Sequence, residues 1–152
     1  MKATPNLLAA ALAGIKSELD GGTLFYFAGP VPANAGDALD MGGQHTQLLA
    51  MSGLNFAAPS GGTLAKDAGE TWSGLIDFDG AQSGDDTLTP TFFRFCAAGD
   101  DGRGAGTMRV QGTIGGPQSS ADIKLGDGTT VTQNGTNTRS LPIFAIEQLL
   151  TG

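Results

Sequence analysis

Six aspartates stand close together in two stretches of the chain and could supply oxygen ligands to a metal ion. They are Asp77, Asp79, Asp85, Asp86, Asp100 and Asp101. Calcium accepts flexible cages of carboxylate oxygens, and the EF-hand loop is a specific sequence pattern for such a cage. Counted from Asp77, the sixth position of that pattern holds Gln82, where a glycine is required. We therefore expect solvated loop carboxylates and no bound metal, with a calcium ion as the alternative.

His45 is the single histidine, and its neighbours Gln44 and Thr46 are polar. A zinc site usually combines several His and Cys ligands, and no second His or Cys stands near His45 in the sequence. The Gly-x-Ser-x-Gly elbow of many hydrolases is also missing. These patterns predict a solvated or hydrogen-bonded histidine, no cofactor and no enzymatic activity.

The glycine-rich stretch 102–106 has the composition of a phosphate-binding loop. The dinucleotide-binding fingerprint would need glycine at position 107, which is Thr107, and a P-loop would need a Lys followed by Ser or Thr, which is missing. Asp100 and Asp101 stand directly before the stretch. We expect a mobile hairpin loop whose glycines supply positive φ angles.

The charge balance excludes several partners. Lys and Arg number 8 against 15 Asp and Glu, which gives a net charge of −7 over 152 residues. Nucleic-acid binders need clustered cations, whereas these cations are scattered singly. No apolar run approaches the roughly 18 residues of a membrane span. We expect neither nucleic acid nor a membrane as a partner. The single cysteine, Cys96, is expected to be buried and to behave as a small apolar side chain.

One short helix is predicted at the N-terminus. Thr4 followed by Pro5 is a typical helix start, and glycines at 21 and 22 are a typical end. Apolar side chains recur between them at steps of four, three and four, at Leu8, Leu12, Ile15 and Leu19. We expect this stripe to pack on the protein's own sheet, with packing on other copies in an oligomer as the alternative.

From Thr23 onward, short apolar segments alternate with turn residues, a pattern typical of an antiparallel β-sandwich of jelly-roll-like type. The candidate strands are 23–27, 46–52, 54–57, 70–78, 91–97, 106–114, 121–125, 129–133 and 141–146, and Asp127-Gly128 is the strongest hairpin turn. The predicted main core consists of the apolar faces of three strands: Trp72, Ile76, Phe78, Phe93, Phe95, Met108, Val110 and Ile114. We expect one domain over residues 1–152, with the helix in 1–22 and the sandwich in 23–152.

Two loops are the candidate interaction sites. A long loop at 29–43 carries Pro30, Val31 and Pro32, and long ordered loops tend to be functional. Prolines restrict the unbound chain, which makes this loop a candidate docking arm. Asp100, Asp101 and Arg103 in the loop 100–106 are candidate rim contacts.

Several motifs follow one another along the chain. The second half has an aromatic-Arg strand at 92–95, Gly-Thr-Ile-Gly at 112–115, Ala-Asp-Ile at 121–123 and a closing strand at 141–146. The first half has a helix leading into Gly-Gly-Thr-Leu at 21–24, and Phe-Ala-Ala-Pro-Ser-Gly-Gly at 56–62. In these features the chain resembles a family of small bacteriophage and prophage virion-associated proteins. The resemblance implies a virion β-sandwich and no particular activity.

On this basis we expect a bacteriophage virion structural protein of the tail, baseplate or fibre apparatus, made in the bacterial host cytoplasm and located in the virion. Capsid decoration is the alternative within that class. A carbohydrate-binding module that contacts a host surface glycan is the alternative from another class, because Trp72, Tyr26 and the Phe-rich strands could form aromatic platforms. A hydrolase is the alternative from a third class. The expected partners are other virion proteins and further copies of the chain, in a trimer or ring.

Overall fold

The computed structural model describes residues 2–79, 87–126, 131–132 and 137–147. Its helix α1 (Pro5–Leu19) has the predicted start, since the side chain of Thr4 accepts a hydrogen bond from the backbone N–H of Leu7. Leu12 and Leu19 are buried in the main core, whereas Ile15 is 37% exposed. The predicted apolar stripe therefore packs on the protein's own core, but it is not fully covered.

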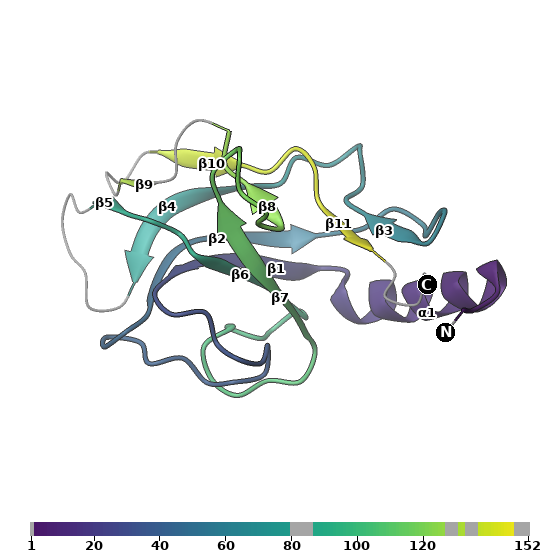
Figure 1. The fold of residues 1–152 in the computed structure, drawn as a ribbon, viewed down its shortest axis with the longest axis horizontal. Coiled ribbons are helices and arrows are strands. Elements are labelled where there is room, and N and C mark those ends of the chain that lie inside the picture. Colours follow the sequence, from purple (N-terminus) through teal and green to yellow (C-terminus); the bar gives the residue numbers. More distant parts are fainter. Residues whose placement is uncertain (1, 80–86, 127–130, 133–136, 148–152) are drawn as a thin grey trace.

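Seven strands form one curled, mixed sheet (Figure 1). In spatial order they are β10 (Thr138–Ser140), β4 (Ser73–Asp79), β2 (Thr46–Leu54), β1 (Gly22–Ala28), β6 (Phe92–Cys96), β7 (Arg109–Gly115) and β8 (Ile123–Lys124). Two further pairs join β3 (Thr63–Ala65) to β11 (Ala145–Glu147) and β5 (Thr87–Leu88) to β9 (Val131–Thr132). The predicted mainly β, sandwich-like class with a short N-terminal helix is confirmed.

The sequence predicts the long strands better than the short ones. All five strands of five or more residues fall on predicted segments, whereas β3, β5 and β10 are not anticipated, because two or three residues carry little periodicity. The pairing of β7 with β8 is parallel, unlike the other strand pairs. The turn Asp127-Gly128 lies outside the described residues; on either side of it, β8 pairs with β7 and β9 pairs with β5.

The main core lies on one face of the seven-stranded sheet, where the β3–β11 pair also contributes. Aromatic rings meet at its centre: those of Phe56 and Phe95 are 5.0 Å apart, and those of Trp72 and Phe144 are 5.5 Å apart. Of the eight predicted core residues, six are buried and Val110 is half-buried. Met108 is 49% exposed, so its prediction as a core residue is wrong. Its side chain lines an open groove beside α1, where no other element that the structure describes covers it.

The opposite face of the sheet, here called the outer face, carries a second apolar cluster. Phe25, Phe27, Phe92 and Cys96 form it, and Leu39 and Met41 of the long loop pack against them. All five residues of β6 are consequently buried, although the sequence predicts a half-buried strand. Cys96 is buried as expected, and burial raises the pKa of its thiol to about 12.

All eight phenylalanines, Trp72 and Tyr26 are buried. A sugar platform needs exposed, coplanar rings, so these side chains do not provide the one on which the carbohydrate-binding alternative depends. Trp72 also uses its polar atom internally, because its indole N–H donates to Glu70 at 3.0 Å.

A carboxylate stands at the β7 edge of the sheet. Asp122 accepts hydrogen bonds from the backbone N–H and the hydroxyl of Thr113, at 2.8 and 3.1 Å. The parallel strand β8 pairs only with the last two residues of β7, at Ile114 and Gly115. The side chain of Asp122 therefore takes the hydrogen-bonding position next to Thr113 that a longer neighbouring strand would occupy.

Candidate interaction surface

Two loops lie next to each other on the outer face of the sheet, below it in Figure 1. We call residues 29–43 the proline loop and residues 100–106 the glycine loop. The N–H of Leu39 donates to the carbonyl of Arg103 at 2.7 Å, and the N–H of Gly106 donates to the carbonyl of Gly36 at 3.1 Å. Backbone hydrogen bonds thus join the two loops directly, and the predicted interaction residues belong to one continuous surface.

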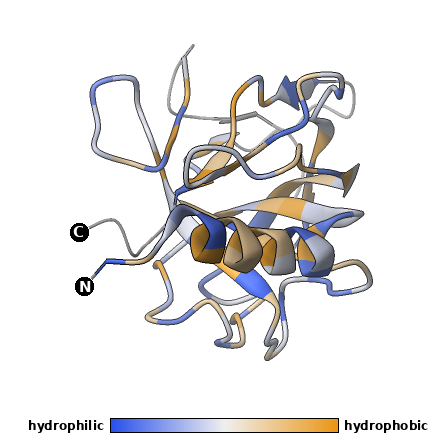
Figure 2. Cartoon of the chain, turned by 90° about the vertical axis from the view of Figure 1, so that its right-hand side faces the viewer, coloured by the Kyte–Doolittle hydropathy of each residue, from blue (hydrophilic) through white to orange (hydrophobic). Residues whose placement is uncertain are grey.

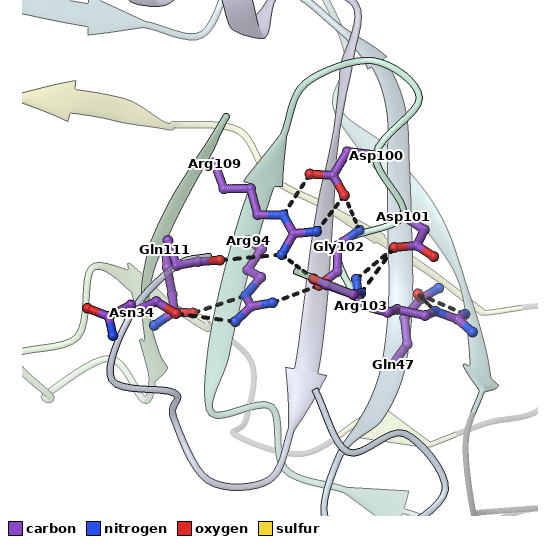
Figure 3. Close-up of polar contacts among 11 residues, drawn as sticks. Asn34, Gln47, Arg94, Asp100, Asp101, Gly102, Arg103, Arg109 and Gln111 are labelled. Carbon is purple, nitrogen blue, oxygen red and sulfur yellow. Dashed lines mark hydrogen bonds and ion pairs between the residues drawn. The ribbon is translucent and has the colours of Figure 1, made fainter. Parts of the chain in front are cut away.

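Arg94 holds both loops onto the sheet (Figure 3). Its side chain is fully buried on the outer face of β6. The guanidinium donates to Gln111 Oε1 at 3.0 Å, to the carbonyl of Gly102 at 2.8 Å and to the carbonyl of Asn34 at 3.4 Å. One side chain therefore contacts a neighbouring strand, the glycine loop and the proline loop at once.

The charge of Arg94 is stabilised by neutral oxygens. Its three hydrogen-bond acceptors are two carbonyls and one amide, and the ring of Phe92 lies 5.9 Å from its guanidinium carbon. Burial lowers the pKa of Arg94, and the like charge of Arg109 lowers it further. Because a guanidinium stays charged in proteins, each of these acceptors offsets part of the cost of burying a cation.

Gln111 extends this contact to the proline loop. While its side-chain oxygen accepts from Arg94, its amide nitrogen donates to the carbonyl of Pro32 at 2.9 Å. His45 acts in a similar way at the start of the loop, because Nε2 donates to the carbonyl of Pro30 at 2.8 Å and Nδ1 accepts from the N–H of Asp40 at 3.1 Å. The expectation of a hydrogen-bonded histidine is confirmed.

Arg109 and Asp100 form an ion pair that shapes the glycine loop. Two nitrogens of Arg109 each donate to one oxygen of Asp100 at 2.6 Å, which is the bidentate geometry favoured by guanidinium and carboxylate. Another nitrogen of Arg109 donates to the carbonyl of Gly104 at 2.7 Å. The hydrogen bond from Arg109 holds the pKa of Asp100 below its ordinary value, and the same bond raises the pKa of Arg109.

The tip of the glycine loop has its own contacts. Asp101 accepts from the N–H of Arg103 at 2.9 Å, a local turn-forming bond. The side chain of Arg103 donates to Gln47 at 3.1 Å and forms an ion pair with Asp79 at the end of β4. Gly102 has a φ of +73, and a Cβ at this position would lie 3.0 Å from the ring of Phe25, so glycine is required here.

The structure brings the six candidate interaction residues together but ties most of them down. The carbonyls of Pro30 and Pro32 accept hydrogen bonds from His45 and Gln111. The side chains of Asp100, Asp101 and Arg103 also form hydrogen bonds. Val31, between the two held prolines, is 46% exposed. The two loops are hydrogen-bonded to each other and to the sheet, and the docking role of the proline loop remains a prediction.

Sequence reasoning misses the residues that organise this surface: Asn34, Arg94, Arg109 and Gln111. One signal was present, because Arg94 is a charged residue inside the apolar run 92–96. Such a residue can be tolerated inside a sheet only when hydrogen-bond acceptors come to it from elsewhere in the chain. The acceptors lie 60 residues before it and 8 residues after it, at Asn34 and Gly102.

Within the described residues, no group of three or more His, Cys, Asp or Glu side chains could hold a metal ion. In the same part of the chain, no helix has the length and apolar character needed to cross a bilayer. Both ion pairs of the glycine loop join it to the sheet, Arg103 to Asp79 of β4 and Asp100 to Arg109 of β7, while Val31 of the proline loop is 46% exposed.

Comparisons of the chain with protein-family models, with curated proteins and with solved structures found no match.

Proposed function

We propose that the protein is a non-enzymatic structural component of a bacteriophage virion that attaches to neighbouring virion proteins through the proline and glycine loops. The virion assignment depends on the resemblance of the chain's motifs to small virion-associated proteins. The tail, baseplate or fibre apparatus is the proposed location in the assembled particle, and capsid decoration is the alternative.

The observation that carries the binding role is the attachment of both loops to the fully buried Arg94. A loop that is already ordered loses little conformational entropy when it binds, so a fixed loop surface binds a partner more tightly than a free one. An exposed valine between two tethered prolines provides an apolar contact on that surface. A carbohydrate partner is less well supported, because the aromatic side chains are buried.

Photo-crosslinking in assembled particles tests this proposal. Particles of the proposed phage would be assembled with a photoreactive amino acid at position 31 of the chain or, as a matched control, at position 75. Val31 and Leu75 are both 46% exposed, but Leu75 lies on β4, outside both loops. We expect the chain in purified particles and a cross-link to another virion protein from position 31 only. Absence from the particles, or equal cross-linking from both positions, would overturn the proposal.

A further inference from the structure

A groove of about 450 Å³ runs between α1 and the start of β7. Ala11, Gly14 and Ile15 line it on the helix side, and Thr107, Met108 and Val110 line it on the strand side. Ile15 is 37% exposed and Met108 is 49% exposed. Figure 2 looks onto the side of the molecule that carries α1, and several stretches of the helix are coloured as hydrophobic there. Glu18 and Arg109 also line it, so the groove is an open, mainly apolar surface with charged groups at its border. Exposed apolar surfaces of this kind often mark interaction sites.

A second stripe of α1 borders this groove. Leu7, Ala11, Gly14 and Glu18 recur at steps of four, three and four, which places them along one line of the helix. All four are exposed, and Leu7 is 60% exposed. The small residues at positions 11 and 14 allow another helix to approach closely, with Leu7 available to enter a facing groove.

The charges at the ends of α1 suit a partner helix that runs in the opposite direction. The first turn of α1 has no acidic residue. The last turn holds Lys16, which is paired with Asp20, and Glu18, whose charge the helix dipole disfavours there. Lys2 precedes the helix and is exposed. Neither the Glu18 nor the Lys2 side chain forms an ion pair or hydrogen bond with the part of the chain that the structure describes. An antiparallel second copy of α1 would place each Glu18 beside the positive end and Lys2 of the other helix.

We propose that two copies of the chain pair through α1 in an antiparallel contact with two-fold symmetry. With the two Ala11 residues facing each other, Leu7 of each copy lies opposite Ile15 of the other and enters the groove beside Gly14 and Met108. The same surface serves both copies, as in most symmetric dimers. This pairing goes beyond the proposed virion role, and it specifies a dimer where the sequence suggests a trimer or ring.

A glutamate in the groove tests the contact. No atom lies within 4 Å of a Cβ added at Gly14, and glutamate favours a helix more than glycine does, so Gly14→Glu fits the monomer. In the dimer it would bury an unpaired carboxylate, which should raise the dissociation constant by roughly 100-fold or more. Ala13→Glu is the matched control, because Ala13 is exposed on the side of α1 away from the stripe. Sedimentation at micromolar concentration should give twice the 15.3 kDa chain mass for the wild type and for Ala13→Glu.

Charge reversal gives a second, independent readout. Lys2→Glu or Glu18→Lys alone should weaken the dimer by about tenfold, because each creates two like-charge contacts. The double variant restores both pairs with the signs exchanged, and its dissociation constant should return to within about fivefold of the wild type. A monomeric or trimeric wild type, equal effects of Gly14→Glu and Ala13→Glu, or no recovery in the double variant would overturn the pairing. The virion role is tested separately by the cross-links from position 31, so either proposal can fail alone.

Discussion

Arg94 and Gln111 occupy directly paired positions on β6 and β7, and Nε of Arg94 donates to Oε1 of Gln111 at 3.0 Å. The other end of the same glutamine amide donates to the carbonyl of Pro32. Gln111 thereby links Arg94 on the neighbouring strand to the proline loop, which lies nearly 80 residues earlier in the sequence. The order of the proline loop depends on the sheet beneath it as well as on its own prolines.

Arg94→Met should lower the free energy of unfolding by about 2–4 kcal/mol, because the carbonyls of Asn34 and Gly102 would lose their buried donor. The amide hydrogens of Leu39 and Gly106, which bond the two loops together, should exchange faster with solvent. Arg103→Met is the control, with an expected loss below about 1 kcal/mol because its ion pair is partly exposed. Unchanged exchange at both amides in Arg94→Met would contradict the role assigned to this arginine.

Asp100 should make the protein less stable in acid. Its pKa in the folded state lies below the ordinary value of 3.8, mainly because Arg109 donates to it, so the unfolded chain binds a proton more readily. The stabilisation is complete above that ordinary value and is lost as the pH falls through the lower folded-state pKa. Asp100→Asn should lower the free energy of unfolding by about 1–2 kcal/mol at neutral pH. It should also make that free energy depend less on pH in the acid range, which urea unfolding at several pH values measures. An unaltered acid profile in the variant would show that other carboxylates dominate.

Gly102→Ala should lower the free energy of unfolding by about 1–3 kcal/mol, because alanine is strained at positive φ and its Cβ would contact Phe25. Gly104→Ala, in the same loop, has no positive φ and no atom within 4 Å of the added Cβ. It should be neutral or slightly stabilising. Urea unfolding of the pair measures the difference, and equal stability of the two variants would refute the conformational requirement at Gly102.

Phe95→Ala should cost about 3–5 kcal/mol, since the ring is fully buried and packs against Phe56, Trp72 and Phe144. Met108→Ala should cost less than about 0.5 kcal/mol in the monomer, because that side chain is half-exposed. Both values come from unfolding at concentrations where the chain is monomeric. A large loss for Met108→Ala under those conditions would place this residue in the core after all.

The sequence predicts what local patterns encode. The cap at Thr4, the strand around Ile76 and the inward face of Phe95 follow from spacing alone, because capping and pleat alternation are local properties. The outer-face cluster was not predicted, because β6 is buried on both sides and its residues therefore show no alternation. For the loop surface, the sequence predicts six of the residues but not how the loops are held. The hydrogen bonds that hold them connect Asn34, Arg94 and Gln111, which lie far apart in the sequence.

The carboxylate of Asp122 at the β7 edge has a further consequence. An uncovered sheet edge is a template on which a strand of another molecule can add, and repeated addition leads to fibrils. Asp122 accepts the N–H of Thr113 and places a negative charge where an incoming strand would have to pair. Two copies that approached through these edges would bring their carboxylates together and repel each other. Asp122 therefore disfavours the addition of a further strand at this point of the β7 edge.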